Sequence, residues 1–118
     1  MKGLSAYQEN RVTTQSKGRL VVLLYEGAIK FLRQAIEEIE AGHWAEKGKY
    51  ISKALAIVDE LNTSLDMEAG GEVAANLRRL YEFMIAHLEQ ANMNRDAEPC
   101  REVIRLLEDT NGAWKVVS

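Results

Sequence analysis

Cysteine, proline and aromatic residues are scarce in this chain of 118 residues. Cys100 is the only cysteine, so neither an internal disulfide nor a cysteine-based zinc site can form. One proline and 7% aromatic residues disfavour a β-sandwich or barrel, which needs frequent turn residues. A fold built from helices is the simplest expectation.

Long apolar runs and an excess of positive charge are also lacking. The longest apolar run covers residues 20–25, far short of the roughly 20 residues of a membrane-spanning helix. The first ten residues lack the apolar core of a secretory signal. A net charge of −3 and a pI near 5.4 give no field that attracts nucleic acid or an acidic membrane. We therefore expect a cytoplasmic protein with no membrane insertion and no nucleic-acid partner.

Apolar residues recur at steps of three and four along most of the chain, which is the signature of amphipathic helices. Residues 1–16 are polar and lack this period, so we expect an irregular N-terminal arm that ends at a capping Ser16. Gly42, the Gly70-Gly71 pair and Asp96, followed by Pro99, mark the later boundaries. The predicted helices are about 17–41, 44–67, 72–92 and 97–114. Short connections between them predict an all-α fold, an antiparallel up-down four-helix bundle over residues 17–118.

The second predicted helix has more apolar surface than a bundle helix usually needs. Its apolar residues form two adjacent rows rather than one stripe. The rows are Trp44, Gly48, Ile51, Leu55, Val58, Asn62 and Leu65, and then Tyr50, Ala54, Ile57 and Leu61. This breadth indicates either a helix deep between its neighbours or a face that is reserved for a partner.

No catalytic, metal-binding or cofactor-binding constellation emerges from the sequence. Glu40 and His43 have the Glu-x-x-His spacing of a di-iron bundle, but such a site needs two of these motifs and only one is present. A phosphotransfer bundle would use an exposed helical histidine, and His43 falls at a predicted helix end. Cys100 has no visible partner base, and its helical position favours a packed thiol. We expect a protein that is not an enzyme, with a phosphotransfer or other helical signalling domain as the alternative.

Three segments resemble the flagellin export chaperone family, FliS. They are the opening VTTQS (12–16) with LVVLLYEGA (20–28), the central LNTSLDMEAGGEVAANLRRLYEFM (61–84), and the later AN (91–92) with AWK (113–115). The sequence departs from the family pattern at two positions, and both fall at predicted helix ends. Lys17-Gly18 stands where the family commonly has proline after the capping serine, and Asn111-Gly112 stands where a charged residue usually precedes Ala-Trp.

The resemblance implies a function in flagellar protein export. A member of this family would bind the disordered C-terminal segment of new flagellin in the cytoplasm. It would thereby prevent premature polymerisation and present flagellin to the type III export gate. An anti-sigma factor or a flagellin-binding assembly regulator is a further candidate partner, and the sequence leaves open whether either one shares the groove.

Apolar side chains at helical spacing are the expected contacts for such a segment. The resemblance also implies that residues 1–16 cover the groove until flagellin displaces them. The candidate partner-binding residues are Tyr7, Val12, Ile51, Ala54, Ile57, Val58, Leu61, Leu65, Leu77, Tyr81 and Met84. Core packing is the competing interpretation for most of them, and a purely structural bundle that associates with itself is a third hypothesis.

Overall fold

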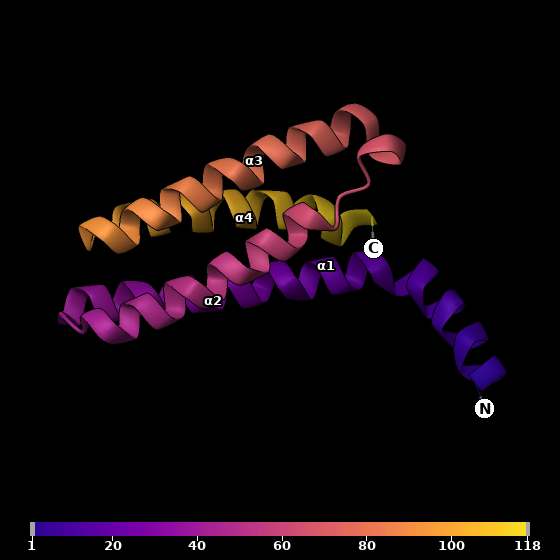
Figure 1. Cartoon of the computed structure of the whole chain (residues 1–118), viewed down its shortest axis with the longest axis horizontal. Coiled ribbons are helices and arrows are strands. Elements are labelled where there is room, and N and C mark those ends of the chain that lie inside the picture. The colour runs from indigo at the N-terminus through magenta and orange to yellow at the C-terminus, as the bar shows by residue number, and fades with distance from the viewer. Residues whose placement is uncertain (1, 118) are drawn as a thin grey trace.

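In the computed structural model the described part of the chain forms four helices that lie side by side (Figure 1). They are α1 (Lys2–Ala41), α2 (Trp44–Thr63), α3 (Met67–Asn94) and α4 (Glu98–Val117). Helix α1 contacts α2 and α4, and α3 contacts the same two neighbours, so α1 and α3 are diagonal to each other. This arrangement confirms the predicted antiparallel up-down four-helix bundle. The structure describes the side chains of residues 18–113; those of the predicted arm, with Tyr7, Val12 and Ser16, and that of Trp114 lie outside this range.

The connection between α1 and α2 follows the sequence prediction. Gly42 has φ +76°, the left-handed conformation that glycine adopts without steric cost. The Gly42 N–H donates to the carbonyl of Ile39 at 3.1 Å, and the His43 N–H donates to that of Glu38 at 2.8 Å. These bonds satisfy carbonyls at the end of α1 and turn the chain sharply into α2.

The boundary between α2 and α3 differs from the prediction. Helix α2 ends at Thr63, not near Met67, and α3 begins at Met67, not near Glu72. The cause is Asp66, whose carboxylate accepts hydrogen bonds from the N–H groups of Glu68 (3.1 Å) and Ala69 (2.9 Å). An aspartate N-cap therefore outweighs the apolar periodicity that continues through this segment. The expected break is still present, because Gly71 (φ 53°, ψ −127°) kinks α3 after its first turn.

The α3–α4 connection combines one predicted and one unexpected feature. Asp96 caps α4 as predicted, because its carboxylate accepts from the Glu98 N–H at 3.0 Å, and Pro99 lies in the first turn. Helix α3, however, continues to Asn94, two residues past the predicted end. It stops at Arg95, which adopts the left-handed conformation (φ 54°) and places its guanidinium over the Trp44 ring.

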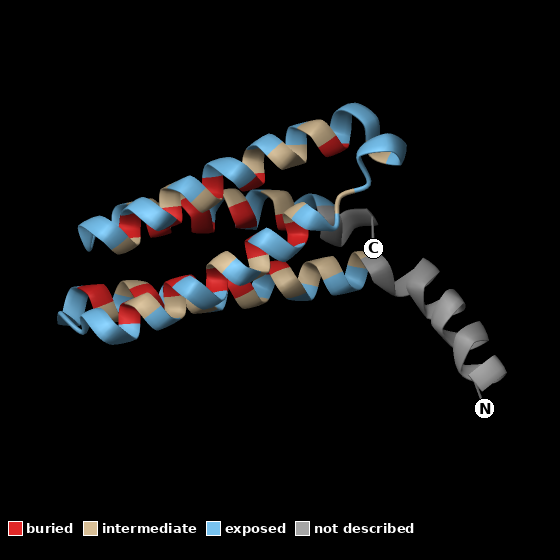
Figure 2. Cartoon of the chain, viewed as in Figure 1, coloured by how far each residue is buried: buried red, intermediate tan, exposed pale blue. Residues whose placement is uncertain are grey.

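Buried residues lie along all four helices (red in Figure 2), and their apolar side chains form one core cluster. Its largest fully buried members are Tyr25, Tyr81, Leu32, Ile51, Met84, Leu88, Leu107, Val58, Val103 and Cys100. Cys100 is packed, as predicted, and burial raises the pKa of its thiol to about 11. A thiol that stays protonated in an apolar core is a poor nucleophile.

Two polar contacts cross this core. The hydroxyls of Tyr25 and Tyr81 form a hydrogen bond that joins the diagonal helices α1 and α3. Burial raises the pKa of Tyr81, and the hydrogen bond with Tyr25 raises it further. At the opposite end of the bundle, the ammonium of the buried Lys47 donates hydrogen bonds to the backbone carbonyl and to the side-chain oxygen of Asn92. Together these contacts fix α3 against both α1 and α2.

Candidate functional site: a hollow between α2 and α3

The predicted partner-binding residues divide into two groups in the structure. Six of them lie in the core and are at most 3% exposed. These are Ile51, Ala54, Val58, Leu61, Tyr81 and Met84. Three others, Ile57, Leu65 and Leu77, are partly buried and pack against the core from its edge. Only this second group presents surface to a partner while the bundle stays closed.

The outer surface between α2 and α3 contains a hollow of about 370 Å³, within the size range of ligand-binding pockets. Its lining residues are Ser52, Leu55, Ala56, Asp59, Ile85 and Glu89. We refer to this feature as the α2–α3 hollow. Sequence reasoning placed Leu55 on an apolar row but did not identify Ser52, Ala56 or Ile85.

The shape of the α2–α3 hollow follows from side-chain size at helical spacing. Ser52 and Ala56 are one turn apart on α2, so they share one face of that helix. Both are small, which leaves a depression between the larger, partly buried side chains of Leu55 on α2 and Ile85 on α3. The small-x-x-x-small spacing beside Leu55 was the signal in the sequence that could have located this depression.

The lining of the α2–α3 hollow combines apolar side chains with two carboxylates. Leu55, Ala56 and Ile85 offer apolar contact, and Asp59 and Glu89 place carboxylates at its margin. An apolar depression of this kind accepts a side chain from a partner helix or an extended segment. The two carboxylates favour a partner with basic residues beside its apolar ones.

Apolar surface also continues outside the α2–α3 hollow. Leu20 and Leu23, near the middle of α1, are 57% and 58% exposed. Between α1 and α2, Phe31 stacks on Tyr50, and both rings are only partly buried. The other large exposed apolar residues are Trp44, Met67, Val73, Phe83 and Met93. The described residues therefore carry apolar surface on several helices beyond what their core encloses.

The histidines do not assemble a catalytic or metal site. His43 Nδ1 lies 2.8 Å from a Glu38 carboxylate oxygen, and His87 Nε2 lies 2.8 Å from one of Glu102. Glu40, the other half of the Glu-x-x-His spacing, instead accepts from Arg101 at 2.7 Å. Within residues 18–113, no cluster of three or more His, Cys, Asp or Glu side chains could hold a metal ion. None of the helices in this range is both long and apolar enough to span a membrane.

Known proteins similar to this chain agree on one family. The sequence model of the family described as "Flagellar protein FliS" matches residues 1–118. The flagellar secretion chaperone FliS of Salmonella typhimurium is 40% identical, over 98% of this chain and 90% of its own length. The flagellar secretion chaperone FliSB of Pseudomonas aeruginosa is 40% identical over 100% of this chain and 97% of its own. FliS of Bacillus subtilis is 36% identical over 94% and 82%.

Proposed function

This chain belongs to the FliS family of flagellar secretion chaperones, and from that premise we propose that it binds the disordered C-terminal segment of flagellin in the cytoplasm. In this proposal the bound segment is kept from polymerising and is presented to the flagellar export gate. The protein acts by sheltering an apolar chain, without a catalytic step. An anti-sigma factor or an assembly regulator is a further candidate for the same surface.

The observation that supports this proposal is the α2–α3 hollow, together with the apolar side chains that remain at the bundle surface. A disordered client pays a large entropy cost when it becomes ordered, so it needs an extended apolar interface to bind well. A narrow catalytic cleft would not supply one. Partly exposed apolar residues distributed along α1, α2 and α3 provide such an interface.

We propose separate roles for the two groups of predicted residues. Ile57, Leu65 and Leu77 contact the client directly, in company with Leu55 and Ile85 of the α2–α3 hollow. The six core residues, from Ile51 to Met84, hold α2 and α3 at the spacing that forms the hollow. Residues 1–16, with Tyr7 and Val12, stay a predicted cover for this surface. A chain lacking residues 1–15 should bind flagellin more tightly and be cleaved faster by proteases.

A matched pair of variants tests the site. Ala56→Glu adds bulk and a carboxylate inside the α2–α3 hollow, whereas Ala86→Glu adds the same group to an exposed part of α3 outside it. Because both alanines are exposed, neither change should unfold the bundle. We expect Ala56→Glu to weaken binding of full-length flagellin by at least about tenfold, or about 1.4 kcal/mol. Ala86→Glu should bind normally.

The readout is co-purification and calorimetry with flagellin and with flagellin lacking its C-terminal segment. Equal recovery of the two flagellins would contradict the proposed client segment. Equal affinity of the two variants for full-length flagellin would contradict the α2–α3 hollow as its site. Light scattering of the protein alone tests the structural alternative, in which the apolar surface joins copies of this chain. No feature of the described residues favours the phosphotransfer alternative, since His43 lies at the start of α2 beside Glu38.

A further inference from the structure

The two carboxylates that line the α2–α3 hollow belong to Asp59 on α2 and Glu89 on α3, and both residues are exposed. Among residues 18–113 neither carboxylate has an ion-pair or hydrogen-bond partner. Arg78, a cation of α3, instead donates to the side-chain and backbone oxygens of Asn62, both at 3.4 Å. In this part of the chain no lysine, arginine or histidine lines the hollow. Two negative charges are therefore open to a partner.

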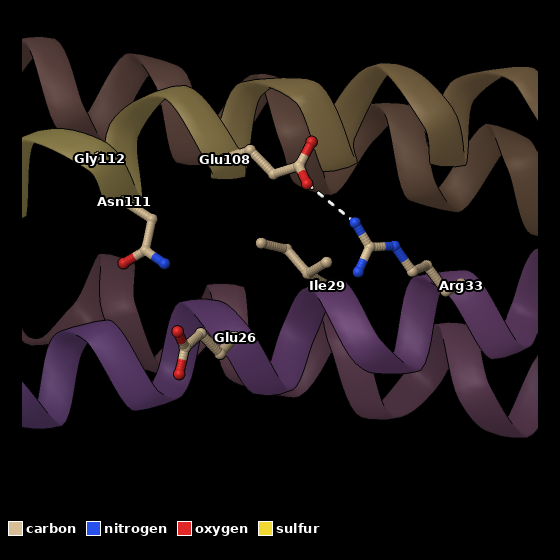
Figure 3. A pocket seen from close by; sticks show the side chains of 6 residues that line it. All are labelled: Glu26, Ile29, Arg33, Glu108, Asn111 and Gly112. Atoms are coloured by element: carbon tan, nitrogen blue, oxygen red, sulfur yellow. Dashed lines mark hydrogen bonds and ion pairs between the residues drawn. The ribbon is translucent and has the colours of Figure 1, made fainter. Parts of the chain in front are cut away.

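A concavity elsewhere in the bundle provides a contrast, because its acidic side chain is already paired (Figure 3). It has a volume of about 340 Å³ and lies between α1 and α4. There Glu108 of α4 forms an ion pair with Arg33 of α1, with Oε2 and Nη2 2.8 Å apart. Asn111 also lines it, but its Oδ1 atom is enclosed and has no hydrogen-bond partner in the described part of the chain. The charge of Glu108 is thus used within the bundle, unlike those of Asp59 and Glu89.

Two polar contacts fix how the antiparallel helices α2 and α3 are aligned along their length. They are the hydrogen bonds from Lys47 to Asn92 and from Arg78 to Asn62. Counted from either contact, Leu55 of α2 lies level with residues 84–85 of α3, and so beside Ile85. Because the helices run in opposite directions, Asp59, one turn after Leu55, and Glu89, one turn after Ile85, lie at opposite ends of the hollow. Four residues span about 6 Å of helix, so the carboxylates frame an apolar centre at about 6 Å on either side.

This spacing matches the repeat of an α-helix that lies along the hollow. Residues four apart on a helix share one face and are about 6 Å apart along its axis. A guest helix with an apolar residue over the centre would therefore place its positions −4 and +4 level with the two carboxylates. An extended segment is disfavoured, because two helices with internally paired backbones offer its N–H and C=O groups no partner. Positive charges at the two flanking positions would complement the ends of the hollow.

We propose that the α2–α3 hollow selects a helical segment in which one apolar residue has a lysine or arginine four residues before it and another four residues after it. The apolar side chain packs on Leu55 and Ile85 in the depression. The two cations pair with Asp59 and Glu89 at its ends. The charges select the segment and its register, whereas the apolar contact supplies most of the affinity. The proposal rests on the proposed function, which takes the hollow as the client site, and adds the sequence that a client segment carries there.

Three synthetic peptides of about 15 residues test the spacing in an alanine-rich helical background. Each has a central leucine; the first has lysines at −4 and +4, the second has glutamates there, and the third has lysines at −2 and +2, away from the leucine face. Fluorescence anisotropy with the full chain measures their affinities. We expect the first peptide to bind about three- to tenfold more tightly than either of the others, as two ion pairs at an exposed margin allow. Raising the salt concentration should reduce this preference.

Variants of the chain then assign the preference to the two carboxylates. Asp59→Asn combined with Glu89→Gln should bind the first and third peptides equally. Asp59→Lys combined with Glu89→Lys should reverse the preference and bind the glutamate peptide best. Glu60→Gln, which removes an exposed carboxylate of α2 outside the hollow, should behave like the parent chain. All three positions are exposed, so the variants should keep the helical circular dichroism of the parent.

Several results would overturn the proposal. Equal binding of the first and third peptides to the parent chain would do so without any variant, and so would an effect of Glu60→Gln as large as that of the double change. A dimer of this chain that Ala56→Glu disrupts would assign the hollow to a second copy.

The outcome for flagellin is separate. Flagellin binding that the Asp59→Asn, Glu89→Gln chain retains in full would overturn the charge selection and leave the proposed function intact. A clear preference for the first peptide by a chain that does not bind flagellin would support the selection and contradict the proposed client.

Discussion

Met84 and Ile85 are neighbours in the sequence that point to different sides of α3. Met84 is fully buried in the core, whereas Ile85 is partly buried and lines the α2–α3 hollow. Replacing Met84 with alanine leaves a cavity and should cost about 2–5 kcal/mol of stability. Ile85→Ala removes three carbons at ~0.8 kcal/mol each when fully buried, hence about 1.5–2 kcal/mol for a side chain that is mostly but not fully buried.

The binding effects should have the opposite order. Ile85→Ala should weaken binding of the flagellin segment at least about tenfold, since it removes a proposed direct contact worth about 1.4 kcal/mol or more of binding free energy. Met84→Ala should leave the affinity of the folded fraction within about threefold of the parent. Urea denaturation followed by helical circular dichroism measures the stability, and calorimetry measures the affinity under conditions where each variant is folded. Met84→Leu, which conserves volume, should lose less than about 1.5 kcal/mol and serves as the control.

One result would refute this reasoning directly. If the folded Met84→Ala chain loses as much affinity as Ile85→Ala, then Met84 contacts the client and the core must open on binding. If Ile85→Ala is the more destabilising of the two, then Ile85 carries core packing that its exposure does not indicate.

Three further changes test the interior and the kink. Tyr25→Phe leaves the buried Tyr81 hydroxyl without this partner and should lower the free energy of unfolding by about 1–3 kcal/mol. A double-mutant cycle with Tyr81→Phe should show a coupling energy between the two hydroxyls above about 0.5 kcal/mol. Because the pKa of the Cys100 thiol is higher in the folded than in the unfolded chain, this group stabilises the fold fully below pH 9 and progressively less toward pH 11. The free energy of unfolding should therefore fall less between pH 9 and pH 11 in Cys100→Ala than in the parent chain. The native thiol should also resist labelling by a thiol reagent at pH 8. Gly71→Ala should cost about 1–3 kcal/mol in urea, since alanine is strained at φ 53°, ψ −127°, and an unchanged midpoint would mean that the kink relaxes freely.

Local signals in the sequence were sufficient for most of the fold. The apolar period predicted four helices, and Gly42, Asp96 and Pro99 marked two of the three connections correctly. Capping and left-handed glycine act within a few residues of the chain, so they can be identified without any tertiary contact. The α2–α3 connection was placed wrongly because Leu65 and Met67 continue the apolar period past the Asp66 cap. Two local signals competed there, and the sequence did not rank them.

The sequence by itself determined the helical class, the bundle topology and the family to which this chain belongs. The tertiary structure alone decided which apolar residues face the core and which face outward. Leu77 and Met84 are seven residues apart on α3 and share one face, but only Met84 is fully buried, because burial depends on how closely the neighbouring helices approach at each level. The α2–α3 hollow arises where small residues of one helix meet larger ones of another, and the unsatisfied oxygen of Asn111 exists only because α1 and α4 enclose it. Both depend on contacts between residues far apart in the chain, which a pattern within one helix does not contain.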